Sequence, residues 1–396
     1  VGEDGKNQGT APAESKTDLY AASATLAYDF SDTLTLKSIT GWRDLDSNFA
    51  RDGDHSPQRI SQFYDDLEQT QVTQELQLLG SHDRLNWILG GYYFHEDGKN
   101  TNILDFTVSN FRSGGKFDNE AWAAFAQATY DLTDRLHLTV GGRYTDEEKS
   151  FKPDQIIFQN YYAGISNVVP PDNPLAALDA PFLQAGERIL PLLKKKIDID
   201  EFTPMASLSF DVTDSVLTYF SYSEGFKSGG FTQRVFPPIV AGFTAPPGTP
   251  DIDLIPTYAP EDVKVYELGF KTAMLDERLR FNGAIFHTKY DDLQVQVFNS
   301  VAPVTENIGE ATINGLELEL QAAPGDGWLV EASFTYLDPD YDDIDTAVTL
   351  IQEDFDFERV PEYAGSLGVS KEFALEDLGF LVVRADWSYR DDTYND

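Results

Sequence analysis

The chain has 396 residues, and its 29 basic and 67 acidic side chains give a formal net charge of −38. This charge argues against a nucleic-acid-binding protein, because phosphate binding needs a basic surface. The absence of cysteine excludes disulfides and thiolate metal sites and suits an oxidising compartment such as a bacterial periplasm or outer membrane.

No apolar run approaches the roughly 18 residues of a membrane helix. The polar, Gly-rich stretch Val1–Lys16 does not have the pattern of a signal peptide. Neither observation excludes a membrane protein, because the strands of a transmembrane barrel alternate in polarity and hardly register in hydropathy windows.

Alternation of apolar and polar residues recurs along the chain and predicts antiparallel strands joined by short polar turns. Ala206–Asp211, for example, places Ala, Leu and Phe on one face and Ser, Ser and Asp on the other. The pattern predicts seven hairpins, with these strands in chain order: Thr17–Phe30 and Thr33–Phe49; Asp66–Leu79 and Leu85–Glu96; Asp118–Asp131 and Arg135–Phe151; a pair within Asp198–Phe231; Asp262–Ala273 and Arg278–Val297; Gly309–Ala322 and Trp328–Leu337; Arg359–Phe373 and Gly379–Arg390.

The connections between hairpins are long and are acidic or rich in Pro and Gly. Short and long connections alternate strictly, which places all short turns at one end of a sheet and all long loops at the other. That layout is typical of an outer-membrane barrel. The predicted long loops are Ala50–Asp65, Asp97–Phe117, Lys152–Ile197, Thr232–Glu261, Phe298–Ile308 and Asp338–Glu358.

Strand length separates a barrel from a soluble sandwich. Many predicted strands run 11 to 16 residues, whereas soluble strands cluster near five or six and a lipid span needs about 9–11. Aromatic residues such as Trp42 and Tyr130 lie at strand ends, as in interfacial girdles. The sequence therefore predicts an all-β fold, a transmembrane antiparallel β-barrel with apolar faces such as Leu316–Leu320 toward lipid and polar faces toward a wet lumen.

Four segments carry a family resemblance: Ala123–Phe151, Leu217–Phe231, Val265–Gln294 and Asn307–Pro324. In order and spacing, the chain resembles the barrel of TonB-dependent outer-membrane receptors, in particular the siderophore-receptor-like group. The resemblance implies a 22-stranded barrel with an N-terminal plug, located in the outer membrane of a Gram-negative bacterium. It also implies uptake of a ferric siderophore or similar scarce nutrient, driven by the TonB energy-coupling complex through a short N-terminal box.

The chain departs from this family pattern at both ends. No plug, box or terminal aromatic strand is recognisable, so residues 1–396 are expected to be a partial receptor barrel with about 14 of its strands. By register, about five strands would precede Thr17 and three would follow Arg390. A fourteen-stranded open sheet would leave two unpaired edges in hydrocarbon, at roughly 2–7 kcal/mol for each unsatisfied group.

The predicted outer loops hold the best ligand candidates. Siderophore recognition commonly needs aromatic faces and a cation for an anionic chelate. The candidates are Arg112, Phe158, Tyr161, Tyr162, Phe231 and Arg234. The net charge opposes an anionic ligand unless a plug supplies positive potential.

No catalytic constellation is recognisable, so no enzyme activity and no cofactor are expected. The five histidines are scattered, and the acidic run Asp338–Asp345 lacks the Gly and the bidentate Glu of an EF-hand. Two other classes stay open: a passive porin or surface adhesin barrel, and a soluble secreted β protein such as a propeller. The long strands argue against a propeller, whose blades are built from short strands.

Overall fold

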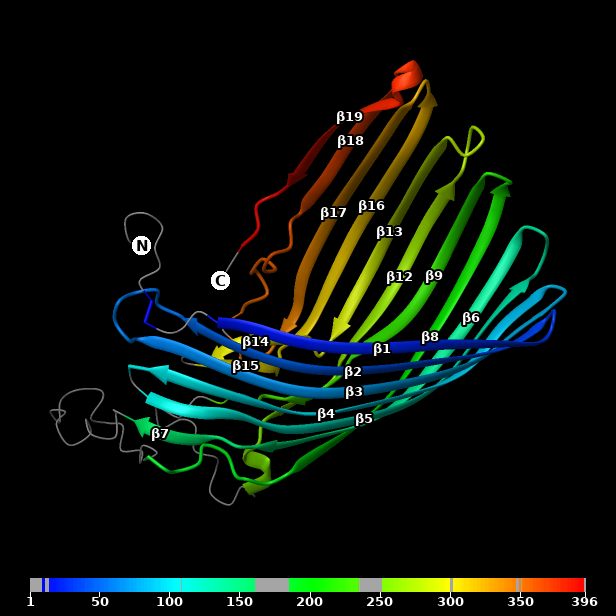
Figure 1. The fold of residues 1–396 in the computed structure, drawn as a ribbon. Coiled ribbons are helices and arrows are strands. Elements are labelled where there is room, and N and C mark those ends of the chain that lie inside the picture. The colour runs from blue at the N-terminus through cyan, green and yellow to red at the C-terminus, as the bar shows by residue number, and fades with distance from the viewer. Residues whose placement is uncertain are drawn as a thin grey trace.

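The structure is a computed structural model that describes residues 9–10, 14–107, 109–160, 185–233, 235, 251–299, 302–346, 349 and 351–394. Most of these residues form one curved antiparallel sheet whose main strands pair in sequence order (Figure 1). The predicted meander of hairpins is thereby confirmed. Its strands are β1 Glu14–Ser31, β2 Leu34–Asp52, β3 Ser61–His82, β4 Leu85–Phe106, β5 Ser109–Asp131, β6 Leu136–Pro153, β8 Lys195–Thr213, β9 Val216–Lys227, β12 Glu261–Thr272, β13 Leu279–Asp291, β16 Gly309–Gly325, β17 Trp328–Ile344, β18 Tyr363–Ala374 and β19 Phe380–Arg390.

Additional short strands lie at one end of this sheet, which we call the loop end. β7 (Ile156–Asn160) pairs with β5, β10 (Gly230–Phe231) with β11 (Thr257–Tyr258), and β14 (Gln294–Asn299) with β15 (Ala302–Asn307). The only helical elements among the described residues are 3-10 turns, η5 (Asp251–Leu254) and η6 (Glu376–Leu378). No helix in the described part of the chain is long and apolar enough to span a membrane.

The short turns gather at the opposite end, the turn end (Figure 1). The turn Leu275-Asp276-Glu277 has φ angles of 57°, 55° and 62°, and Asp326 has 50°. These left-handed conformations reverse the chain within a few residues. The predicted segregation of short turns from long connections is therefore present in the fold.

One face of the sheet carries a continuous apolar row across four adjacent strands. Leu208, Phe220, Leu268 and Ile285 are successive cross-strand partners from β8 to β13, and their exposed fractions are 44, 49, 52 and 53%. Each such side chain favours an apolar environment over water by roughly 1.5–3 kcal/mol. We call this row the lipid row and its side of the sheet the outward face, because lipid hydrocarbon provides the apolar environment that these side chains favour.

The predicted orientation of Leu316–Leu320 agrees with this arrangement. Leu316 is the partner of Ile285 and extends the lipid row onto β16. Leu316, Leu318 and Leu320 are all partly exposed, and the other sheets among the described residues are two-stranded ribbons. These leucines are therefore not enclosed between two stacked sheets, as a soluble sandwich would require.

The opposite, inward face is polar. Ser207, Ser221 and Glu267 are successive partners on β8, β9 and β12, one residue away from the lipid row. The Tyr219 hydroxyl donates a 2.6 Å hydrogen bond to Glu267 on this face. A polar inward face opposite an apolar outward face is the arrangement of a barrel wall around a wet lumen.

Several predicted long loops are instead continuations of strands, and these predictions were wrong. Asp97–Phe117 was expected to be a loop, yet β4 and β5 pair almost to their tips through partners such as Lys99 and Lys116. Asp338–Ile344 belongs to β17, so the acidic run is not an outer loop, and Phe298–Ile308 contains most of the β14–β15 ribbon. Beyond the membrane both faces of a strand meet water or other loops, so the alternation that reveals a strand is lost.

Small cores stabilise these extensions. One cluster of buried side chains, Val297, Val304, Ile308, Ala311, Tyr341 and Ile344, joins the β14–β15 ribbon to β16 and β17. A second joins Leu104, Phe111 and Ile157 on β4, β5 and β7. Tyr341 also stacks on Phe357 at 4.1 Å. The loop end is thus folded structure with its own apolar contacts.

Candidate ligand-binding site

A segment from the loop end folds over the inward face. We call it the mouth segment: residues 228–233 and 251–258, which contain β10, β11 and η5. Lys149 Nζ donates to the Gly229 carbonyl oxygen at 2.9 Å, and Lys195 Nζ donates to that of Ile255 at 2.8 Å. Lys149 and Lys195 lie on β6 and β8, so the mouth segment is fastened to two strands of the wall.

The mouth segment is also packed through aromatic contact and close backbone approach. Phe231 lies against Phe151, with ring centroids 5.7 Å apart, and Phe151 is 1% exposed. A Cβ on Gly229 would lie 2.6 Å from the Tyr258 carbonyl oxygen, so the glycine permits the turn into β10. Phe231 remains partly exposed and so presents part of its ring at the mouth of the lumen.

A cation lies among aromatic rings further down the same wall. Arg143 is three residues from outward-facing Val140 on β6 and therefore faces inward. Its guanidinium carbon is 5.2 Å from the Tyr92 ring centroid and 5.9 Å from that of Phe125. Its Nε donates to the Thr145 hydroxyl at 3.0 Å. No carboxylate among the described residues pairs with Arg143, so its charge is available to an anion in the lumen.

The predicted candidates are only partly brought together. Arg112 on β5 and Phe158 on β7 lie on paired strands. Arg112 lies ten residues from outward-facing Trp122, on the same face of β5, and its Nη2 forms an ion pair with Asp154 at 2.8 Å. Phe158 is 45% exposed, next to fully buried Ile157. Neither shares a surface with Phe231, which lies on the mouth segment over the inward face.

The other three candidates, Tyr161, Tyr162 and Arg234, lie outside the described residues. Arg143 was not among the residues predicted from the sequence to contact a ligand. The available signal was a cation at an inward position near aromatic residues. This signal is informative only when Tyr92 is known to lie beside Arg143. Tyr92 is distant in sequence and becomes a neighbour only through strand pairing.

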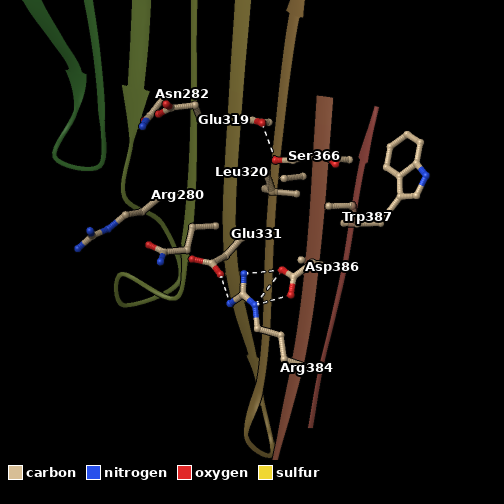
Figure 2. A pocket seen from close by; sticks show the side chains of 15 residues that line it. Arg280, Asn282, Glu319, Leu320, Glu331, Ser366, Arg384, Asp386 and Trp387 are labelled. Carbon is tan, nitrogen blue, oxygen red and sulfur yellow. Dashed lines mark hydrogen bonds and ion pairs between the residues drawn. The ribbon is translucent and has the colours of Figure 1, made fainter. Parts of the chain in front are cut away.

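Nearer the turn end, charged side chains line a hollow of about 640 Å³ on the inward face of β13 and β16–β19. Figure 2 shows the Arg384 guanidinium between two carboxylates, with nitrogen–oxygen distances of 2.7 Å to Glu331 and 2.8 Å to Asp386. Trp387 points to the other side of the sheet and is 60% exposed. The lumen wall is therefore polar in this region, and ion pairs connect its strands.

The chain matches the family described as "TonB dependent receptor-like, beta-barrel" over residues 2–396. Among solved structures, it is similar to the ferric yersiniabactin uptake receptor FyuA from Yersinia pestis. That likeness has a TM-score of 0.72 and 19% identity, and it covers 96% of this chain and 50% of the receptor. The siderophore receptor PiuA from Acinetobacter baumannii gives a TM-score of 0.65 at 16% identity, covering 96% of this chain and 56% of that one.

Curated relatives point the same way. A probable TonB-dependent siderophore receptor PiuA from Acinetobacter baumannii is 38% identical over 80 residues, which is 20% of this chain and 10% of that protein. The ferric-pyoverdine 358 receptor from Pseudomonas putida is 24% identical over 239 residues, 59% of this chain and 22% of the receptor. The chain thus spans about half the length of the solved receptors and less of the curated ones.

The family match, the polar lumen wall and the lipid row agree with one another. Members of this family are outer-membrane receptors and transporters, so the loop end faces the cell exterior and the turn end the periplasm. The chain belongs to the β-barrel domain family of TonB-dependent outer-membrane receptors.

Proposed function

We propose that this chain forms the wall of a receptor that takes up a ferric siderophore or a similar scarce nutrient, with energy supplied by the TonB complex. The observation that carries the proposal is the mouth segment, which is fastened over the inward face by Lys149 and Lys195. A receptor needs surfaces over its lumen to capture a ligand, and the mouth segment supplies such a surface.

Arg143 is the residue of this chain that we propose meets the ligand's negative charge. Its guanidinium is held by the rings of Tyr92 and Phe125 and by Thr145, so little side-chain entropy is lost on binding. The chain's net charge of −38 repels an anionic chelate at long range. Recognition would therefore rely on fixed cations at short range, with Phe231 offering an aromatic surface above.

We also propose that the sheet is part of a larger barrel. β1 pairs only with β2 and β19 only with β18 among the described strands, and an open edge in hydrocarbon costs several kcal/mol per unsatisfied group. The chain spans about half of the solved receptors. Further strands would therefore close the barrel, and a plug would fill its lumen. The plug would carry the contact with the TonB complex.

Uptake of a radiolabelled ferric siderophore by cells carrying the full-length receptor tests the function. We expect uptake to stop when the membrane potential is collapsed, because energy coupling requires it. We expect Arg143→Gln to weaken ligand binding about tenfold, the equivalent of about 1.4 kcal/mol, while Arg135→Gln at an exposed turn leaves binding unchanged. Uptake that continues without membrane potential would identify a passive pore and refute the proposal.

A further inference from the structure

A histidine lies between two carboxylates at the turn end of the sheet. His137 on β6 has its Nδ1 2.6 Å from Asp131 Oδ1 on β5 and its Nε2 3.1 Å from Asp211 Oδ2 on β8. His137 is three residues from outward-facing Val140, so the three side chains meet on the inward face. Asp131 follows the interfacial Tyr130 on the side of the turn, so the group lies beyond the hydrocarbon. We call these three residues the rim cluster, because the turn end is the periplasmic rim of the wall.

The geometry of the rim cluster requires a proton on each ring nitrogen. A carboxylate ion can only accept hydrogen bonds, and a neutral imidazole carries a single N–H. Only the imidazolium form of His137 can therefore donate to both Asp131 and Asp211. The hydrogen bond to Asp131 and then that to Asp211 raise the pKa of His137 above its usual 6.5, and partial burial opposes this rise without cancelling it. The cluster thus holds a proton that a free histidine releases near neutral pH.

The bond to Asp211 connects two hairpins at an end where the chain itself does not join them. The connection between β6 and β8 leaves from the loop end, so no turn joins these strands at the turn end. The β8–β9 register shifts between Asp211 and Thr213, which makes the ladder irregular beside the cluster. His137 and Asp211 are 74 residues apart in sequence. Their contact therefore links the hairpin β5–β6 to the hairpin β8–β9.

The other charged side chains of the neighbouring turns do not compete for the rim cluster. Arg84 forms an ion pair with Asp134 at 2.7 Å. Arg135 and Asp214 are exposed, and neither forms an ion pair with another described residue. The two carboxylates of the cluster therefore govern the protonation of His137.

We propose that the rim cluster is a pH-sensitive fastener of the barrel wall, which holds the two hairpins together at the periplasmic rim while both ring nitrogens of His137 are protonated. Loss of one proton leaves a single N–H, which stays with the nearer Asp131, and turns a lone pair toward Asp211. The contact between the hairpins is then repulsive. Because the pKa of His137 is higher in the folded protein than in the unfolded chain, the link is complete below pH 6.5 and is lost as the pH rises through the folded pKa.

Hydrogen exchange of the purified full-length receptor in detergent, followed by mass spectrometry, tests this fastener. The readout is the protection of two peptides, residues 129–137 and 207–215, between pH 6 and pH 9, after correction for the intrinsic pH dependence of exchange. We expect protection to fall about tenfold across this range, the effect of one lost charge-assisted hydrogen bond. The assay uses no transported ligand, so its outcome is independent of the proposed uptake function.

Variants of the cluster separate the fastener from a merely structural role. His137→Gln should remove the pH dependence, because no titrating group is left. Asp131→Asn and Asp211→Asn should each shift the midpoint of the transition to lower pH, since each removes one carboxylate from the imidazolium. His82→Gln is the matched control, because His82 lies at the same end of the sheet with an 82% exposed side chain. It should keep the wild-type profile.

NMR of the receptor with isotope-labelled histidine gives a second measurement on the wild-type protein itself. The His137 signal, identified by its absence from the spectrum of His137→Gln, should be that of an imidazolium at pH 7. A neutral His137 at this pH would overturn the proposal. So would wild-type protection that stays constant from pH 6 to pH 9, or a transition that His137→Gln retains.

Discussion

Lys149 on β6 donates a 2.9 Å hydrogen bond to the Gly229 carbonyl oxygen, 80 residues further along the chain. With the bond from Ser228 to Glu147 at 2.5 Å, it holds the start of the mouth segment against the wall. A lysine that binds a backbone oxygen fixes the path of the segment whatever side chains the segment carries. The position of the candidate site therefore depends on the wall as much as on the loop.

Removing that bond should loosen the mouth segment without unfolding the sheet. We expect Lys149→Met to raise the amide exchange of residues 228–233, because a charged hydrogen bond of this kind contributes about 1.5–3 kcal/mol. Hydrogen exchange with mass spectrometry measures it. Lys196→Gln, which removes an outward-facing lysine on neighbouring β8, should leave exchange in the mouth segment unchanged. Equal protection in wild type and Lys149→Met would show that packing alone holds the segment.

The lipid row predicts opposite outcomes for two neighbouring residues. Phe220 faces outward and is 49% exposed, whereas Ser221 faces the lumen. Phe220→Arg should lower the free energy of unfolding by roughly 2–4 kcal/mol, the cost of a cation against lipid. Ser221→Arg should change it by less than about 1 kcal/mol. Urea unfolding of the full-length receptor in lipid vesicles measures both, and similar losses for the two variants would contradict the assignment of faces.

Gly309 starts β16 with φ at +136°, and a Cβ there would lie 1.7 Å from the Asp343 carbonyl oxygen. Gly309→Ala should therefore break the Gly309–Ile344 end of the β16–β17 pair and expose the β14–β15 ribbon. Gly325→Ala is the control for backbone strain alone, because its φ is +115° with nothing within 4 Å. We expect about 1–3 kcal/mol for Gly325→Ala and a larger loss for Gly309→Ala in the same unfolding assay. Equal losses would show that the contact with Asp343 relaxes freely.

The ion pairs of Asp154 with Arg112 and Arg188 predict that the stability of the loop end depends on pH. Burial by itself raises its pKa, but hydrogen bonds and charges from Arg188 and Arg112 outweigh burial and place the pKa below the usual 3.8. Because the pKa of Asp154 is lower in the folded protein than in the unfolded chain, its ion pairs stabilise the fold fully at any pH above the unfolded pKa. This stabilisation is lost as the pH falls through the folded pKa. The segment that carries Arg188 should therefore stay protected from proteolysis at pH 7 and loosen only below 3.8. Asp154→Asn should loosen it at every pH, and identical pH profiles for the two proteins would refute this role.

The sequence by itself determined the strands inside the membrane. Hydrocarbon requires apolar residues at every second position on one face, so Leu208, Leu268 and Leu316 reveal strand, face and register. Short turns with residues such as Asp276 are equally recognisable in the sequence, because only certain residues allow the chain to reverse within three positions. The fold class and the hairpin order follow from this pattern.

Only the tertiary structure decided what happens beyond the membrane. There both faces of a strand can be polar, so Lys99–Phe106 and Asp338–Ile344 looked like loops although they pair as strands. Arg143 gains its aromatic neighbours, and His137 its contact with Asp211, only through pairing between strands far apart in sequence. The candidate ligand site was placed by cross-strand register, which no local sequence pattern encodes outside the lipid-facing part of the strands.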